Sequence, residues 1–192
     1  AIVGAGLAGL SCAYTLAKAG LDVLVVERGD YPGSKNVTGG RLYMNPVRRH
    51  LPDIWEDAPF ERHIAKERLT MMSEDTSVTL EVRSDAYTKP PCHSYTLIRP
   101  TFDRWLAEKA SAAGAAVIAK YKVEGLLREG GKIAGIRAEG EDIGANVVVA
   151  ADGAMSFIAK EAGLRSKDDP EHFALGVKET VELPRKTIED RF

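Results

Sequence analysis

Three glycines near the start of the chain constrain its fold more than any other feature. The sequence opens AIVGAGLAGL, so that Gly4, Gly6 and Gly9 follow a short apolar run and precede a segment with helical periodicity. A second apolar run at residues 22–26 is typical of a strand buried on both faces. The order strand, glycine turn, helix and strand predicts a βαβ unit.

The spacing of these glycines predicts a bound adenine dinucleotide. Gly4 permits the tight turn, Gly6 lets backbone approach a pyrophosphate, and Gly9 lets the helix pack closely on the strand. The anion then lies on free N–H groups at the helix start. Glu27 ends the second strand, where a carboxylate can accept hydrogen bonds from ribose hydroxyls and repels the 2′-phosphate of NADP(H). The alternative is a purely structural turn, with Glu27 as a solvated charge.

The segment after Glu27 bears on the choice between FAD and NAD. A simple NAD domain continues with regular βα repeats, whereas residues 28–41 read RGDYPGSKNVTGGR, an irregular and glycine-rich stretch. Such a loop can extend along an elongated cofactor, with glycines that allow backbone to approach a flat ring. A flexible surface loop is the alternative. The candidate contacts in this segment are Arg28, Gly33, Asn36, Thr38, Gly39, Gly40 and Arg41.

Two later stretches place further candidates at the ends of elements. The run LIRPTFDRWL leads into a predicted helix that continues through Ala113, with Thr101 as its cap and Phe102 on its inner side. The run VVVAADG predicts a buried strand that ends in Asp152 at the carboxyl edge of the sheet, where ligands gather. An ordinary helix cap is the alternative role for Asp152.

The remaining pattern predicts an α/β fold in which two domains interleave. Residues 69–72, 77–82 and 93–98 are expected as strands of a substrate domain, joined by a strand at 172–182, and residues 122–127 and 132–138 as a hairpin of the cofactor domain. A strand at 115–119 and a helix at 186–191 are also expected. We expect an FAD-binding domain at 1–60 and 94–165 and a substrate or cap domain at 61–93 and 166–192. Only three residues precede Gly4, fewer than a strand usually has, and the chain stops at Phe192 without an element typical of a domain end. We therefore expect the N-terminal part of a longer protein.

The composition argues against several other classes of protein. The 192-residue chain has a net charge of −2, which argues against nucleic-acid binding. Its longest apolar stretch, residues 145–151, is far shorter than the roughly 20 residues of a membrane-spanning helix. Cys12 and Cys92 are the only cysteines, which favours a reducing, cytoplasmic setting. Residues 47–55 are at best a weak candidate for peripheral contact with the inner membrane.

We predict no catalytic acid or base and no metal ligand in this chain. The four histidines have no partner at a compelling spacing, and the chain lacks the Gly-x-Ser-x-Gly, HExxH and Walker patterns. Hydrolase and kinase functions are therefore disfavoured. In a flavoprotein this is expected, because the isoalloxazine carries the redox chemistry and protein groups position it.

Four motifs together resemble a large FAD-dependent family that contains aromatic hydroxylases, geranylgeranyl reductases and electron-transfer-flavoprotein:quinone oxidoreductases. They are GAGLAGLSCAYTLAKAG, the Glu that ends the second strand, the Arg-x-x-Phe-Asp-x-x-Leu run from Arg99, and VVVAADG. The stretches GSKNVTGGRLYMNPV and EHFALGVKE resemble FixC-type members of that family. The resemblance implies a Rossmann-like, three-layer FAD-binding domain with an interleaved β-rich substrate domain.

The resemblance also implies roles for individual residues. Gly4, Gly6 and Gly9 would hold the FAD pyrophosphate and Glu27 the adenosine ribose. Arg99 would contact the phosphate or ribityl region, with an ordinary surface arginine as the alternative. Val123 is placed where relatives meet adenine through backbone, and Asp152 with Gly153 matches an Asp-Gly motif near the pyrophosphate. The later Gly-Asp-Ala segment of the family is not found within these residues.

For the FixC-type members, the resemblance implies oxidation of a reduced electron-transfer flavoprotein, with electrons passed to a ferredoxin-like partner or a quinone. No iron–sulfur cysteine set lies in this chain. Two alternatives stay open. One is a monooxygenase or geranylgeranyl-type reductase that uses NAD(P)H, and the other is a non-catalytic dinucleotide-binding module.

Overall fold

The computed structural model of the protein describes residues 1–166, 171, 173–177 and 179–191. At its centre is a four-stranded parallel sheet in the order β12-β1-β2-β8. Ile2, Val25 and Val26 in this sheet are almost fully buried, as the short apolar runs predict. The strands are β1 (Ile2–Val3), β2 (Leu24–Val26), β8 (Ala116–Ile118) and β12 (Val149–Ala150).

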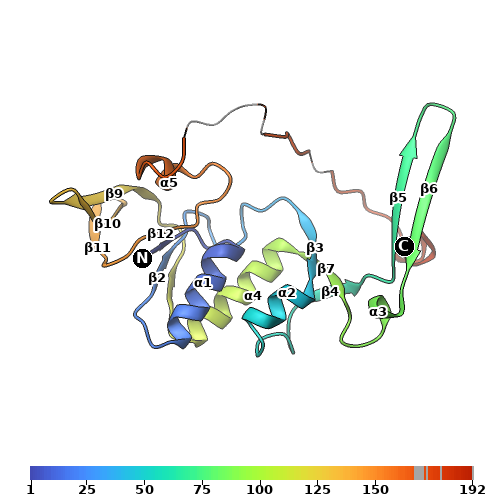
Figure 1. The fold of residues 1–192 in the computed structure, drawn as a ribbon, viewed down its shortest axis with the longest axis horizontal. Coiled ribbons are helices and arrows are strands. Elements are labelled where there is room, and N and C mark those ends of the chain that lie inside the picture. The colour runs from blue at the N-terminus through green and yellow to red at the C-terminus, as the bar shows by residue number, and fades with distance from the viewer. Residues whose placement is uncertain (167–170, 172, 178, 192) are drawn as a thin grey trace.

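Two helices cover one face of this sheet. Helices α1 (Leu7–Lys18) and α4 (Arg99–Ala112) lie side by side against it (Figure 1). Leu10 from α1 and Phe102 and Leu106 from α4 join strand residues in the larger hydrophobic core. The apolar positions of both helices recur at three- and four-residue spacing, which is why each helix turns one stripe toward the sheet.

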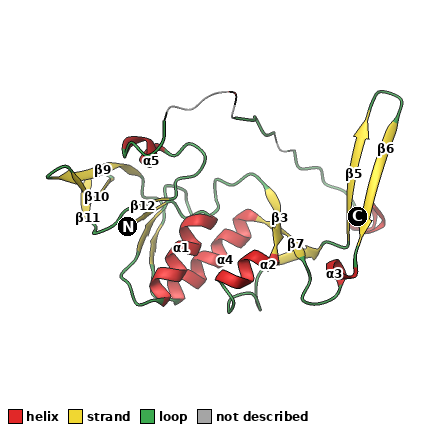
Figure 2. Cartoon of the chain, in the orientation of Figure 1, coloured by secondary structure: helices red, strands yellow, loops and turns green. Residues whose placement is uncertain are grey.

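A second, antiparallel sheet covers the opposite face (Figure 2). Ile136 from this sheet packs with Val3 and Val26 in a smaller core, which Ile158 completes from α5. The elements are β9 (Val123–Glu129), β10 (Lys132–Ala138), β11 (Glu141–Gly144) and α5 (Phe157–Glu161). The predicted hairpin is confirmed and gains a third strand, and the three layers confirm the Rossmann-like fold.

The remaining strands form two smaller sheets. One has the order β3-β7-β4, and β7 continues directly into α4; the other is the hairpin β5–β6, which projects away from the body (Figure 1). Their bounds are β3 (Gly39–Tyr43), β4 (Phe60–His63), β5 (Lys66–Met72), β6 (Ser77–Arg83) and β7 (Ser94–Ile98). The short helices are α2 (Met44–His50), α3 (Asp85–Thr88) and α6 (Arg185–Arg191). The strands expected at 69–72, 77–82 and 93–98 are thus confirmed.

Two expectations about α4 and the loop before β3 were wrong. The helix begins at Arg99 with no side-chain cap, so Thr101 lies inside its first turn. Pro100 has a backbone angle suited to a first helical turn, which favours the earlier start. Gly39–Arg41 is strand rather than loop, because it pairs with Thr96–Ile98 of β7.

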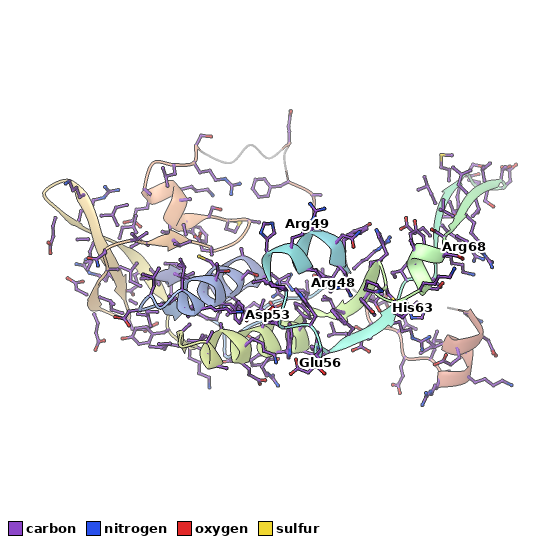
Figure 3. All side chains as sticks on the ribbon, turned by 60° about the horizontal axis from the view of Figure 1, so that its bottom comes forward. Arg48, Arg49, Asp53, Glu56, His63 and Arg68 are labelled. Carbon is purple, nitrogen blue, oxygen red and sulfur yellow. The ribbon has the colours of Figure 1, made fainter. Side chains whose placement is uncertain are left out.

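Two further segments differ from expectation. Among the described residues of 173–182 none is in a strand, while His172 and Lys178 lie outside the described residues. The candidate membrane-contact segment 47–55 is not one helix, because α2 ends at His50. Figure 3 shows Arg48 and Arg49 on α2 and the acidic Asp53 and Glu56 after it, so the charge of this surface is mixed.

The close packing of α1 on the glycine turn predicts the effect of substituting Gly9. A Cβ at Gly9 would lie 2.0 Å from the Gly4 carbonyl oxygen, whereas a Cβ at Gly6 would meet no atom within 4 Å. We expect Gly9→Ala to lower the free energy of unfolding by about 2–3 kcal/mol, because α1 must move off the turn. Denaturant titration measures this change. Gly6→Ala is the matched control and is expected to change stability by less than about 0.5 kcal/mol. Equal stability of the two variants would contradict the packing role of Gly9.

Candidate functional site

A cavity of about 600 Å³ opens at the carboxyl edge of the central sheet. Its size is typical of pockets for small molecules and cofactors. It is lined by residues from the ends of β1, β2 and β12, from the loop after β2, from the start of β9 and from α5. They are Val3, Gly4, Ala5, Gly6, Val26, Glu27, Arg28, Gly33, Lys35, Asn36, Lys122, Val123, Glu124, Ala151, Asp152, Gly153, Phe157, Ile158 and Glu161.

The glycine turn forms one wall of this cavity. Gly4 has φ +103°, and a Cβ there would lie 2.5 Å from the Ala151 carbonyl oxygen, so only glycine fits beside the chain where it leaves the paired strands β1 and β12. Gly6 faces open space, where a ligand can approach the backbone. Gly9 lies behind the turn and does not line the cavity. The three positions therefore have the three different environments that a dinucleotide turn requires.

The N-terminus of α1 is built to receive an anion. In the described structure no side chain caps it and no acidic residue lies in its first turn. The intrahelical hydrogen bond from Leu10 N to Gly6 O leaves the N–H groups of residues 7–9 without helical acceptors. These donors and the positive end of the helix dipole attract phosphate oxygens. Together with the space at Gly6, they fit a pyrophosphate.

Glu27 joins the glycine turn to the loop after β2. Its Oε2 accepts a hydrogen bond from Ala5 N at 2.9 Å, and its Oε1 accepts one from Gly29 N at 2.6 Å. An ionised carboxylate has about four acceptor sites, so two backbone donors leave capacity for ribose hydroxyls. Glu27 therefore connects the glycine turn to the loop after β2 and is still available as a hydrogen-bond acceptor in the cavity wall.

Asp152 combines the two roles that its sequence position suggested. Its Oδ2 accepts a hydrogen bond from Ile158 N at 2.9 Å, which fixes the first turn of α5, and its side chain lines the cavity. The following Gly153 has φ +79° and open space beside it. Val123 lines the cavity from the start of β9, where its ladder partner is Ala138.

Nine of the fifteen candidate cofactor contacts lie together on the cavity and six do not. The first group is Gly4, Gly6, Glu27, Arg28, Gly33, Asn36, Val123, Asp152 and Gly153. The second group is Gly9, Thr38, Gly39, Gly40, Arg41 and Arg99. Gly39 and Gly40 are strand residues paired with Ile98 and Leu97.

Arg41 contacts the base of the β5–β6 hairpin. Its Nε donates to Ser94 Oγ at 2.9 Å, its guanidinium pairs with Glu67 on β5, and it stacks on the Tyr43 ring. The hydrogen bond from Arg41 lowers the pKa of Glu67 below its usual range. Arg41 thus holds β5 against β3 and β7, and the structure gives it no contact with the cavity.

Arg99 pairs with a buried carboxylate that sequence reasoning gave no role. Its Nε and Nη2 donate to the two oxygens of Asp103 at 2.7 and 2.8 Å. Asp103 also accepts from Asn36 Nδ2 at 2.6 Å, and Asn36 lines the cavity. An Asp one helical turn after an Arg, within an apolar helix stripe, was the available signal. Arg99 is therefore part of a buried network and not an ordinary surface arginine.

Two kinds of site are not seen in the part of the chain that the structure describes. No group of three or more His, Cys, Asp and Glu side chains could hold a metal ion there. None of the described helices combines the length and apolar character that crossing a bilayer requires.

The comparison with protein families agrees with the geometry of the cavity. The family described as "FAD binding domain" matches residues 1–187. An FAD adenylate half needs an anion site, a ribose acceptor and a backbone edge for adenine, and the cavity offers all three. The residues present therefore fit this cofactor.

Curated relatives match along the whole chain, and a solved structure matches most of it. Protein FixC of Azotobacter vinelandii is 47% identical over 193 residues, covering 100% of this chain and 44% of that protein. The probable electron transfer flavoprotein-quinone oxidoreductase YdiS of Escherichia coli K12 is 43% identical over 191 residues, covering 100% of this chain and 44% of that protein. A geranylgeranyl bacteriochlorophyll reductase-like structure from Thermoplasma acidophilum is 33% identical with a TM-score of 0.73, covering 86% of this chain and 41% of that one. The chain spans less than half the length of these relatives.

The double role of Glu27 predicts the effect of reversing its charge. Glu27→Lys removes the acceptor of two backbone donors and places a cation beside them, so we expect the purified variant to lose its FAD and its yellow colour. Absorption spectra of variant and wild-type protein measure this. Asp22→Lys, an exposed acid just before β2, is the control and is expected to keep FAD. Yellow colour retained by Glu27→Lys would contradict the assigned role.

Proposed function

The chain belongs to the FAD binding domain family, and from that membership we propose that it is the cofactor-holding part of an FAD-dependent oxidoreductase. We propose further that the enzyme passes electrons from a reduced electron-transfer flavoprotein to a ferredoxin-like partner or a quinone. Support comes from the curated relatives, because proteins named FixC and a probable electron transfer flavoprotein-quinone oxidoreductase are 42–47% identical over the whole chain.

The observation that carries the proposal is the cavity in which the glycine turn, Glu27 and Val123 meet. In the proposed complex, the N–H groups at the start of α1 hold the pyrophosphate, which Gly6 allows to approach. Glu27 accepts from the adenosine ribose, and the backbone at Val123 meets adenine. Asp152 and Gly153 border the pyrophosphate, and Arg28 lies on the ribose side.

The other predicted contacts remain predictions. Gly39, Gly40, Arg41 and Arg99 lie on β3 and at the start of α4, outside the cavity wall. An elongated cofactor that continues from the cavity along residues 28–38 would approach this region. Gly9 supports the site by letting α1 pack on the turn.

FAD, when bound, accepts two electrons together and can release them singly, which suits a carrier between a flavoprotein donor and a one-electron acceptor. The task of the chain's own residues is to bind and orient it. In the proposed complex, Glu27 favours an unphosphorylated ribose, and the uncapped N-terminus of α1 offsets part of the pyrophosphate charge. No catalytic acid or base is assigned to this part of the protein.

A second candidate function is a prenyl-chain reductase that uses NAD(P)H. The specific observation in its favour is the 33% identity and TM-score of 0.73 to the geranylgeranyl bacteriochlorophyll reductase-like structure. This candidate has the same FAD site but a different electron source. The two candidates therefore differ in which donor reduces the bound FAD.

We also propose the domain division that the sequence suggested, with the FAD-binding domain at 1–60 and 94–165. The substrate or cap domain would take residues 61–93 and 166–192. The salt bridge between Arg62 on β4 and Glu189 on α6 supports a common layer for the two parts of the cap domain.

The proposed donor predicts a clear kinetic result. We expect the oxidised flavin absorption of the purified protein, expressed from its complete reading frame, to disappear on anaerobic mixing with reduced electron-transfer flavoprotein. NADPH at the same concentration is expected to act far more slowly. Stopped-flow absorption measures both rates, and the colourless Glu27→Lys variant serves as the blank. Fast reduction by NADPH with no response to the flavoprotein would favour the reductase instead, and a protein that never binds flavin would favour a non-catalytic module.

A further inference from the structure

Asp103 is a buried charge with no role in the function proposed above. Its side chain is 0% exposed, although it lies on α4 only four residues from the helix start. Among the buried residues in the described part of the chain, it is the one that carries a charge. Burying a carboxylate is costly unless charged or polar donors surround it, so the donors around Asp103 show what it holds in place.

Three donors converge on this carboxylate. The guanidinium of Arg99 gives two, in the bidentate geometry that fixes an arginine most strongly, and the amide of Asn36 gives the third. Three of the five N–H donors of Arg99 remain after this pairing. Because a carboxylate only accepts, the Asn36 amide nitrogen faces Asp103 and its carbonyl oxygen is turned away.

The loop after β2 rests on the first turn of α4 at other points as well. A Cβ at Gly33, which has φ +89°, would lie 2.8 Å from the Asp103 Cβ and 3.0 Å from the Pro100 Cα. Arg104 covers the Tyr31 ring at 4.3 Å. The loop is therefore fixed to α4 along its length.

The same loop forms one wall of the cofactor cavity, through Gly33, Lys35 and Asn36. The contacts of Asp103 thus lie directly behind that wall. A carboxylate that only stabilised α4 would need no partner in the loop. Its bond to Asn36 spans 67 positions of sequence and joins the helix to the cavity.

We propose that Asp103 is a positioning residue for FAD, acting through Asn36 and Arg99. Its buried carboxylate sets the orientation of the Asn36 amide and of the Arg99 guanidinium, and so sets the wall against which the cofactor lies. The inference rests on FAD as the cofactor and is independent of which donor or acceptor the enzyme uses. Asp103 itself contacts no ligand in this scheme.

The test measures FAD affinity separately from folding. Asp103→Asn keeps the side-chain shape and removes the charge, and we expect the dissociation constant of FAD to rise about tenfold or more. Titration of the apoprotein, with flavin fluorescence as the signal, gives this constant. Denaturant unfolding of the apoprotein gives stability. Asp57→Asn is the matched control, because it breaks the ion pair between Asp57, in the segment before β4, and Lys109 on the same helix α4, and neither residue lines the cavity. We expect it to change FAD affinity less than about twofold.

A second variant covers the case in which Asp103→Asn does not fold. Asn36→Ala leaves the Arg99–Asp103 pair intact, and we expect it to raise the FAD dissociation constant about threefold or more with little change in apoprotein stability. If Asp103 acts through Asn36, the double variant weakens FAD binding less than the product of the single effects. Unchanged FAD affinity in Asn36→Ala would overturn the proposal, as would full affinity in folded Asp103→Asn. If instead wild-type protein failed to bind FAD while folded, the FAD site itself would be wrong.

Discussion

The close approach of three backbone segments at the end of β1 is the constraint on which the rest of the structure depends. The turn at Gly4 passes beside the carbonyl of Ala151 on one side and Gly9 of α1 on the other, with no space for a Cβ at either glycine. This contact sets the height of α1 above the sheet. It also aims the N-terminus of α1 into the cavity, so that the packing requirement and the anion site come from the same few atoms.

Glu27 turns this packing arrangement into a binding site. A carboxylate at the end of β2 could have pointed to solvent, but Ala5 N and Gly29 N both donate to it. These bonds hold the glycine turn and the following loop at a fixed separation. Since hydrogen bonds to a charged group are stronger than neutral ones, they stabilise the carboxylate in the cavity wall, where it can still accept from a ribose.

Local patterns explain why most of the cavity could be predicted from the sequence. Gly4, Gly6, Glu27 and Asp152 stand at the ends of short apolar runs, and the ends of parallel strands meet at one edge of a sheet. Long-range pairing explains the errors. Gly39 and Gly40 have turn composition but pair with β7, more than fifty residues away in the chain, and no local signal reports that contact.

The buried network around Asp103 was missed for a related reason. An Asp inside a helix ordinarily faces solvent, because burial of its charge is costly without partners. Its partners come from two places: Arg99 lies one turn earlier on the same helix, whereas Asn36 comes from a distant loop. The helical pattern predicted an inner side of α4 with Phe102 on it, but it could not indicate that a carboxylate within that apolar stripe would bond to a side chain from a distant loop.

The position of α4 links the cavity to the smaller sheets. Strand β7 runs into α4 without a connecting loop, so Ile98 is the last residue of the strand and Arg99 the first of the helix. Strand β3 follows the cavity loop and pairs with β7 along its whole length. The cavity loop is therefore held at one end by β3 and along its length by the first turn of α4. The Arg41–Glu67 pair extends these contacts from β3 to the β5–β6 hairpin. The hairpin and the cavity loop are therefore connected through β3, which pairs with β7 along its whole length.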